Sequence, residues 1–264
     1  MYSFAYHRPS SATEAEALAA KAGEARFLAG GMTLLPAMKL RLAQPTDLID
    51  LSRLADLRGI KLIGSEVRIG AMTLHAAVAA SPEVKRAIPA LAHLAGVIGD
   101  PQVRNRGTLG GSLANNDPAA DYPAAVLGLN ATVHTSRRTI PADSFFRGLF
   151  ETALEPGELI TAVSFPIPER AAYEKFRHPA SRYAVVGVFV ARTAGGVRVG
   201  VTGAGPCAFR ATQLEQALAR DFSPDALKGI TIPADGLNSD IHAAADYRAH
   251  LIGVMARRAV AAIA

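Results

Sequence analysis

The chain has 264 residues, of which half are hydrophobic and 19% charged, as in ordinary soluble globular proteins that hold two domains. No apolar run reaches the roughly 18 residues that cross a bilayer and no signal-peptide layout is visible, so we expect a cytoplasmic location without a membrane span. The basic residues behind the net charge of +5 are scattered, which argues against nucleic-acid binding, and the single cysteine, Cys207, excludes an internal disulfide.

The first seventy residues predict alternating helices and strands followed by a hairpin. A capping box, Ser11-Ala12-Thr13-Glu14, opens the first helix. The order is a helix to Ala22, a strand at 26–29, a helix at 34–40, a strand at 47–51, and a hairpin of 60–63 and 67–69. This is the beginning of a βα-type unit.

The middle of the chain predicts two helices and then a long loop. Thr73 is placed to cap a short helix that runs through Ala80, and Pro82 to begin a second helix that reaches about Ile98. Residues 99–121 carry Pro, Gly, Asn and Asp without periodicity, so little regular structure is expected there. Loops of that length inside compact domains are uncommon and are often functional.

The last part of the chain predicts a three-stranded antiparallel sheet backed by helices. A hairpin of 131–135 and 139–140 and a strand at 159–165 come first, and Pro166-Ile167-Pro168 marks a domain boundary. The sheet strands are expected at 173–176, 184–192 and 197–202, and the helices at 210–220 and 243–263.

Two runs of small residues carry the strongest functional signal. Ala29-Gly30-Gly31-Met32-Thr33 follows an apolar strand and opens a helix, and Thr108-Leu109-Gly110-Gly111-Ser112 lies in the long central loop. Glycine lets a backbone come close to a ligand, and N–H groups that open a helix suit phosphate. Neither run is a phosphate-binding loop of the GxxxxGK[ST] kind or a GxGxxG fingerprint. Two such turns, each followed by a hydroxyl residue, suggest a pyrophosphate held from two sides.

The central loop, residues 99–121, resembles the FAD-binding loop of the flavin subunit of molybdenum hydroxylases, the xanthine dehydrogenase and carbon monoxide dehydrogenase family. The turn at 29–33 resembles that family's first flavin motif, and the resemblance extends over essentially the whole chain. It implies an α+β fold of the p-cresol methylhydroxylase and vanillyl-alcohol oxidase (PCMH/VAO) type. The FAD-binding domain would span 1–167, with subdomains of about 1–55 and 56–167, and a C-terminal domain would span 168–264.

The resemblance also implies a set of cofactor-binding residues and no catalytic or metal-ligating ones. The FAD pyrophosphate would lie on the backbone of Ala29, Gly30, Gly31, Met32, Thr33 and Leu34, with Thr108, Gly110, Gly111 and Ser112 approaching it from the second loop. Ile98 and Ile160 match apolar positions that pack on the cofactor, Asp121 a carboxylate at the adenosine part, and Lys175 a lysine at the polar edge of the flavin ring. Tyr183 is a candidate to cover one flavin face.

Some of these residues have plainer explanations. Asp121 by itself is a cap before Pro123, Lys175 a solvated strand residue, and Tyr183 a tyrosine packed at a domain boundary. Met32 departs from the polar residue often found after the double glycine, which leaves only its backbone for a contact.

The implied function is electron transfer inside a larger enzyme. A large molybdopterin-binding subunit would oxidise the substrate, and a small [2Fe-2S] subunit would pass the electrons to the FAD of this chain, in a dimer of heterotrimers (a heterohexamer). The terminal acceptor stays open between NAD, a quinone, a cytochrome and oxygen. The alternatives are a stand-alone flavin-dependent oxidase or dehydrogenase, and a binding module that has lost FAD.

Overall fold

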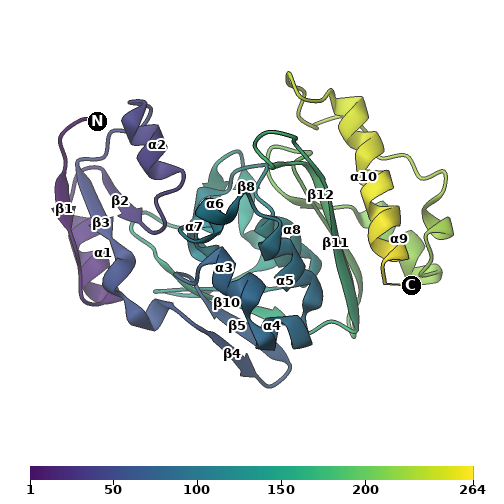
Figure 1. Ribbon diagram of the computed structural model, residues 1–264, viewed down its shortest axis with the longest axis horizontal. Helices are drawn as coiled ribbons and strands as arrows, with labels where there is room; N and C mark the ends of the chain where they lie inside the picture. The colour runs from purple at the N-terminus through teal and green to yellow at the C-terminus, as the bar shows by residue number, and fades with distance from the viewer. Residues whose placement is uncertain (264) are drawn as a thin grey trace.

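The computed structural model describes residues 1–263, and Figure 1 shows three regions that follow one another along its long axis. The N-terminal region is a parallel sheet in the order β1-β3-β2, built from β1 (Ala5–His7), β3 (Asp47–Asp50) and β2 (Ala25–Leu28). The helices α1 (Ala12–Lys21) and α2 (Leu34–Lys39) connect these strands. The predicted helix–strand alternation of this region is therefore confirmed.

The first helix begins where the capping box predicts. The Ser11 hydroxyl accepts a hydrogen bond from the Glu14 N–H at 3.1 Å, which satisfies one of the free donors of the first turn. The Glu14 carboxylate accepts from the Ser10 N–H rather than from Ser11, at 2.7 Å. The region has its own small core around Ala15 and Ile49, which extends to the short 3₁₀ turns η1 (Leu51–Arg53) and η2 (Ala55–Leu57).

The central region is built on an antiparallel sheet of five strands in the order β4-β5-β10-β6-β7. These strands are β4 (Ile60–Ile63), β5 (Glu66–Gly70), β10 (Ile160–Pro166), β6 (Thr132–Thr135) and β7 (Thr139–Pro141). Six short helices belong to this region: α3 (His75–Ala80), α4 (Pro82–Ala87), α5 (Pro89–Gly96), α6 (Pro101–Arg104), α7 (Leu109–Asn115) and α8 (Tyr122–Gly128). A turn η3 (Ala142–Ser144) precedes a small hairpin of β8 (Phe146–Gly148) and β9 (Glu151–Thr152).

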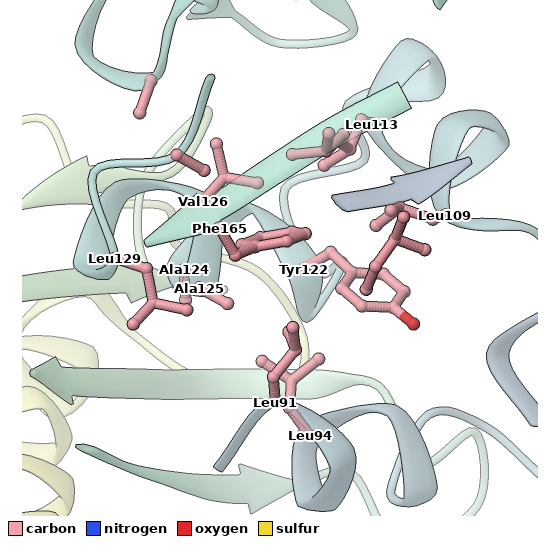
Figure 2. Close-up of a cluster of buried hydrophobic side chains, with 14 of the residues drawn as sticks. Leu91, Leu94, Leu109, Leu113, Tyr122, Ala124, Ala125, Val126, Leu129 and Phe165 are labelled. Atoms are coloured by element: carbon pink, nitrogen blue, oxygen red, sulfur yellow. The ribbon is translucent and has the colours of Figure 1, made fainter. Parts of the chain in front are cut away.

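The central core is a layer of apolar side chains in which the ring of Tyr122 is fully buried. Figure 2 shows this ring between the leucines of α5 and α7, near Phe165 of β10. Because α7 and α8 both contribute to this core, the segment 116–121 between these two helices is fixed at both ends.

Three expectations for this region were wrong. Thr73 does not cap a helix, because its hydroxyl accepts from the Gly59 N–H at 3.0 Å and α3 begins only at His75. The single helix expected from Pro82 is two helices, since Pro89 disfavours helical geometry at Ile88, which has φ −140° and ψ 72°. The segment 99–121, expected to hold little regular structure, contains α6 and α7.

The C-terminal region is an antiparallel sheet in the order β11-β12-β13-β14, with helices on both faces. Its strands are β11 (Arg170–Arg177), β12 (Ala184–Thr193), β13 (Gly196–Thr202) and β14 (Phe209–Arg210). The three expected strands are confirmed, and β14 is a short fourth one. The helices α9 (Thr212–Arg220) and α10 (Ala245–Ala261), joined through η4 (Asp225–Leu227), cover one face, and α5 and α8 cover the other (Figure 1).

The strand β12 lies between two cores and alternates accordingly. Phe189 and Ala191 face the central core, whereas Val186, Val188 and Val190 face the core under α10. A strand buried on both faces reads as a continuous apolar run, which is what residues 184–191 show. None of the helices in residues 1–263 has the length and apolar character that a membrane crossing requires.

Candidate functional site

The two glycine turns lie in direct contact. A Cβ atom on Gly30 would be 2.1 Å from the Arg106 carbonyl oxygen and 2.9 Å from the Gly107 Cα, so no side chain fits there. A Cβ atom on Gly111 would be 3.4 Å from the Ala29 Cβ. The two turns are therefore close enough to bind one ligand between them. This closeness depends on Gly30 and Gly111, because a side chain at Gly30 would push the turns apart.

The first turn offers a run of free backbone donors. Among the residues that the structure describes, the N–H groups of residues 30–34 have no hydrogen-bond acceptor. Gly31 has φ +74°, and its carbonyl accepts from the Leu35 N–H as α2 begins. The side chains of Met32 and Thr33 are exposed, so contacts here come from the backbone. Successive free N–H groups at a helix start form a concavity for an anion such as pyrophosphate.

The second turn is different, because its backbone donors are already in use. The N–H groups of Leu109 and Gly110 donate to Thr73 and Ala71 carbonyls, and that of Gly111 donates to the Thr108 hydroxyl. Gly110 is buried against Ala71, where a Cβ would be 2.6 Å from the alanine Cβ. Thr108 is 2% exposed and its hydroxyl is occupied by the bond from Gly111, whereas Ser112 is partly exposed, so the polar side chain that the turn leaves accessible is that of Ser112.

Asp121 and Lys175 form a buried ion pair. The Lys175 ammonium nitrogen is 2.8 Å from Asp121 Oδ1, with the side chains 4% and 3% exposed. Tyr173 donates to the same carboxylate oxygen at 2.5 Å, and Lys175 donates to the Val97 carbonyl at 2.9 Å. Burial raises the pKa of Asp121, and the ammonium and the phenol oppose that rise. Burial beside this carboxylate also raises the pKa of Tyr173 well above its usual value.

The contact between Asp121 and Lys175 was not expected from the roles that the resemblance implied. Asp121 was expected at the adenosine part and Lys175 at the flavin ring, which are opposite ends of an extended FAD. The structure instead places their charged groups 2.8 Å apart. The plainer explanations fail: Asp121 makes no side-chain capping bond, and Lys175 is not solvated.

Two of the remaining predicted residues are close to this pair, namely Ile98, which follows Val97, and Tyr183, whose pKa responds to the charge of Asp121, whereas Ile160 lies in the central core. Ile98 is 9% exposed and follows Val97, and its carbonyl accepts from Arg104 at 2.9 Å. Ile160 is 3% exposed at an irregularity where β10 meets β6. Tyr183 is 52% exposed, and partial burial with the charges of Asp117 and Asp121 raises its pKa.

Sequence reasoning missed two residues that shape the site. Tyr173 was assigned only to a strand, although its hydroxyl reaches Asp121. His75 has no metal-ligand spacing, yet its backbone N–H donates to the Gly107 carbonyl at 3.0 Å. Its ring also packs on Gly107, because a Cβ atom on that glycine would be 2.5 Å from His75 Nε2. Burial first, and then the charge of Arg104, lower the pKa of His75 to about 4. Alternation of apolar residues gave no signal for either role.

Comparisons with known proteins show the family to which the chain belongs. The profile of a family described as "FAD binding domain in molybdopterin dehydrogenase" matches residues 2–168. The carbon monoxide dehydrogenase medium chain of Hydrogenophaga pseudoflava is 39% identical over 97% of this chain and 96% of its own length. The nicotine 6-hydroxylase medium subunit of Paenarthrobacter nicotinovorans is 36% identical, with 97% and 95% covered.

Solved structures agree over the whole length. A chain of the crystal structure of Cu,Mo-CO dehydrogenase superposes with a TM-score of 0.90 at 38% identity, covering 98% of this chain and 97% of that one. A chain of quinoline 2-oxidoreductase from Pseudomonas putida 86 gives a TM-score of 0.89 at 29% identity, with 99% and 96% covered.

Proposed function

Because the chain belongs to the family of FAD-binding medium subunits of molybdenum hydroxylases, we propose that it carries electrons inside such an enzyme, from [2Fe-2S] clusters of a partner to a terminal acceptor. The observation that carries the proposal is the contact between the two glycine turns, with five consecutive free N–H groups on one of them. A pyrophosphate is the ligand that such a concavity suits. Bound FAD would supply a carrier that exchanges one or two electrons.

We assign the cofactor to this chain's residues as follows. The backbone of residues 29–34 holds the pyrophosphate, and the hydroxyl of Ser112 contacts it or the adjoining ribityl chain from the second turn. Ile98 and Ile160 pack against the cofactor. Lys175 and Asp121 act together at the flavin ring, where Tyr183 supplies an aromatic face. A buried ammonium there would favour negative charge on the ring, and its carboxylate partner would moderate that effect.

The electron source is proposed to lie on other polypeptides. Cys207 is the one cysteine of the sequence, and residues 1–263 hold no group of three or more His, Cys, Asp or Glu side chains that could bind a metal. The clusters and the molybdopterin therefore belong to a small and a large partner subunit. We further propose a dimer of heterotrimers in the cytoplasm, with the FAD-binding domain at 1–167, divided near residue 55, and a separate C-terminal domain at 168–264.

The visible spectrum of the purified chain, expressed alone and together with the genes beside its own, tests the proposal. Flavin absorbance that is released as FAD on denaturation, with co-purifying molybdenum and iron subunits, is the expected result. FAD with turnover by the lone chain would favour the stand-alone oxidase. A preparation without flavin in either case would overturn the assignment of the glycine turns.

A further inference from the structure

We propose that the N-terminal region, residues 1–57, is a hinged lid that controls the entry and release of FAD, and that a polar clamp on α1 holds it closed. Figure 1 shows this region, here named the lid, at one end of the molecule. The clamp consists of Glu16 on α1 and of Ser136 and Arg137 in the turn between β6 and β7. The inference rests on the proposed function, because it places the cofactor between the two glycine turns.

The clamp joins the lid to the central region through one carboxylate. Glu16 Oε1 accepts a hydrogen bond from the Ser136 hydroxyl at 2.7 Å and another from Arg137 Nε at 3.1 Å. Arg137 also donates to the Pro156 carbonyl at 3.3 Å, so its guanidinium is anchored in the central region. The side chains of Glu16 and Arg137 are 22% and 40% exposed. Partly solvated ion pairs of this kind are weak, so they break easily.

Little apolar surface holds the lid besides this clamp. Among the described buried residues of the central region, only Met72 and Leu159 join the apolar core of the lid. Regions of one chain move relative to each other unless the contact between them is large and hydrophobic. The polar clamp therefore has a large share in keeping the lid closed.

The chain crosses between the two regions once, at residues 57–60, and this crossing is suited to be the pivot. Gly59 has φ +104°, which glycine adopts without strain, and no atom lies within 4 Å of the place that a Cβ would take. The N–H groups of Met72 and Gly70 donate to the carbonyls of Leu57 and Gly59, at 2.7 and 2.9 Å, and so hold the crossing to the central region. Hinges are a few residues at the ends of elements that absorb backbone changes.

The lid carries one of the two turns assigned to the FAD pyrophosphate. Residues 29–34 belong to the lid and residues 106–112 to the central region, and Gly30 meets Arg106 and Gly107 where the two turns touch. A cofactor that contacts both turns binds the closed lid better than an open one, in which the turns separate. Bound FAD therefore favours the closed lid, and it leaves when the lid opens.

Opening of the lid sets both rates of FAD exchange. Where the open form is a minor state, a weaker clamp raises its population in the free and in the FAD-loaded protein alike. Association and dissociation then accelerate by the same factor, and the dissociation constant stays the same. A substitution that damages the closed site accelerates dissociation alone, so the two rates together distinguish a clamp from a contact that merely stabilises the site.

Glu16→Ala tests the clamp, because alanine keeps α1 helical while the carboxylate is lost. We expect the rate constants of FAD association and dissociation, measured by stopped-flow flavin fluorescence, to rise together by about three- to tenfold, with the dissociation constant unchanged within about twofold. Asp225→Asn is the control, since it removes an exposed ion pair with Lys228 inside the C-terminal region. Its two rate constants should equal those of the wild type.

A disulfide beside the clamp should have the opposite effect. A Cβ atom on Gly157 would be 3.6 Å from the Ala19 Cβ, within the roughly 3.5–4.5 Å that a disulfide spans. Gly157 has φ +73°, which strains a cysteine, so the reduced form of the same protein is the reference. In Ala19→Cys/Gly157→Cys, with Cys207→Ser to leave a single pair of thiols, FAD release should be at least about tenfold slower in the oxidised than in the reduced protein.

Equal release from the oxidised and the reduced protein would overturn the proposal, and so would acceleration of dissociation alone in Glu16→Ala. The FAD content of each sample is measured from its visible spectrum, and its folding by circular dichroism. Folded wild-type protein that binds no FAD would overturn the proposed function and the lid with it. Normal FAD content with equal release would overturn the lid alone.

Discussion

The ammonium nitrogen of Lys175 lies 2.8 Å from the Asp121 carboxylate, with both side chains excluded from solvent. Taking two charges out of water is costly, and their attraction offsets that cost only while both are present. Hydrogen bonds from Tyr173 and to the Val97 carbonyl satisfy the remaining groups. The pair therefore joins α8 and the 97–99 segment to β11 and acts as one unit.

Removing one partner of this pair is expected to destabilise the protein strongly. Lys175→Met should lower the free energy of unfolding by about 3–5 kcal/mol, because it leaves a buried, unpaired carboxylate. The double variant Lys175→Met/Asp121→Asn should recover part of that loss, since no unpaired charge remains. Urea unfolding at pH 7 measures both values.

The exposed pair of Lys228 and Asp225, with side chains 70% and 76% exposed, gives the control for this experiment. Lys228→Met should change the free energy of unfolding by less than about 1 kcal/mol. A cost for Lys175→Met as small as this one would mean that the buried pair is solvated in solution.

The midpoint potential of bound FAD reports where the pair acts. In Lys175→Ala the potential should fall, because a positive charge that favours the reduced, anionic ring is lost. Spectroelectrochemical titration of the FAD-loaded variant gives the value. An unchanged potential together with weaker FAD binding would move the pair to the adenosine end of the cofactor.

The close contact of the glycine turns predicts that Gly30→Ala loses FAD. The added Cβ would lie 2.1 Å from the Arg106 carbonyl oxygen, so the turns must separate and the concavity opens. We expect the FAD dissociation constant to rise at least about tenfold, with a loss of roughly 1–3 kcal/mol in stability from the forced shift. Flavin fluorescence on dilution measures the binding.

Gly195→Ala is the control, because a Cβ there meets only the Thr193 hydroxyl oxygen, at 3.7 Å. It should leave FAD binding unchanged. Wild-type affinity in Gly30→Ala would show that the first turn does not hold the cofactor.

Much of the fold was predictable because local signals agreed with the tertiary structure. The capping box at Ser11 and the apolar run at 184–191 each defined an element that long-range contacts then buried. The errors arose where a distant partner decided the outcome. Thr73 has the right spacing to cap a helix, but its hydroxyl bonds to Gly59, a partner that no local pattern reveals.

The sequence singled out the glycine turns of the site, but it did not predict which side chains lie in contact. The glycine turns stood out because runs of small residues cannot fill a core, and they do lie together. The ion pair joins residues 121 and 175, and neither residue's neighbours in sequence indicate the other. Their separate roles came from a resemblance that specifies positions along a chain and not distances between them.

The carboxylate of Glu158 predicts a loss of stability in acid. Arg138 contacts it through two hydrogen bonds of 3.0 and 2.9 Å, and this lowers its pKa to about 2. A depressed native pKa adds stability above the unfolded-state pKa of about 4.5, and this is lost as the pH falls toward about 2. Glu158→Gln should therefore cost roughly 3 kcal/mol at pH 7 and much less at pH 3, measured by urea unfolding.

Glu24→Gln, at an exposed position, should give the same small change at both pH values. An equal cost of Glu158→Gln at pH 7 and pH 3 would mean that the carboxylate is not charged in the native state.

Buried His75 predicts a second pH effect, at higher pH and with a different cause. Its native pKa of about 4 lies below the ordinary value of 6.5, because burial and the Arg104 charge disfavour the imidazolium. The unfolded chain therefore binds a proton before the native protein does, and stability falls as the pH drops from about 6.5 to about 4. Between pH 7 and pH 5 this loss should be roughly 2 kcal/mol.

His75→Leu should remove this part of the pH dependence at little cost at pH 7, because His75 Nδ1 is buried without a hydrogen-bond partner in the described structure. Since His75 supports Gly107 behind the second glycine turn, FAD should dissociate faster at pH 5 than at pH 7 in the wild type, and less so in the variant. Urea unfolding and flavin release at both pH values measure the two effects, with exposed His250→Leu as the control. If stability and flavin release changed with pH equally in wild type and in His75→Leu, a group other than His75 would be responsible for the pH dependence.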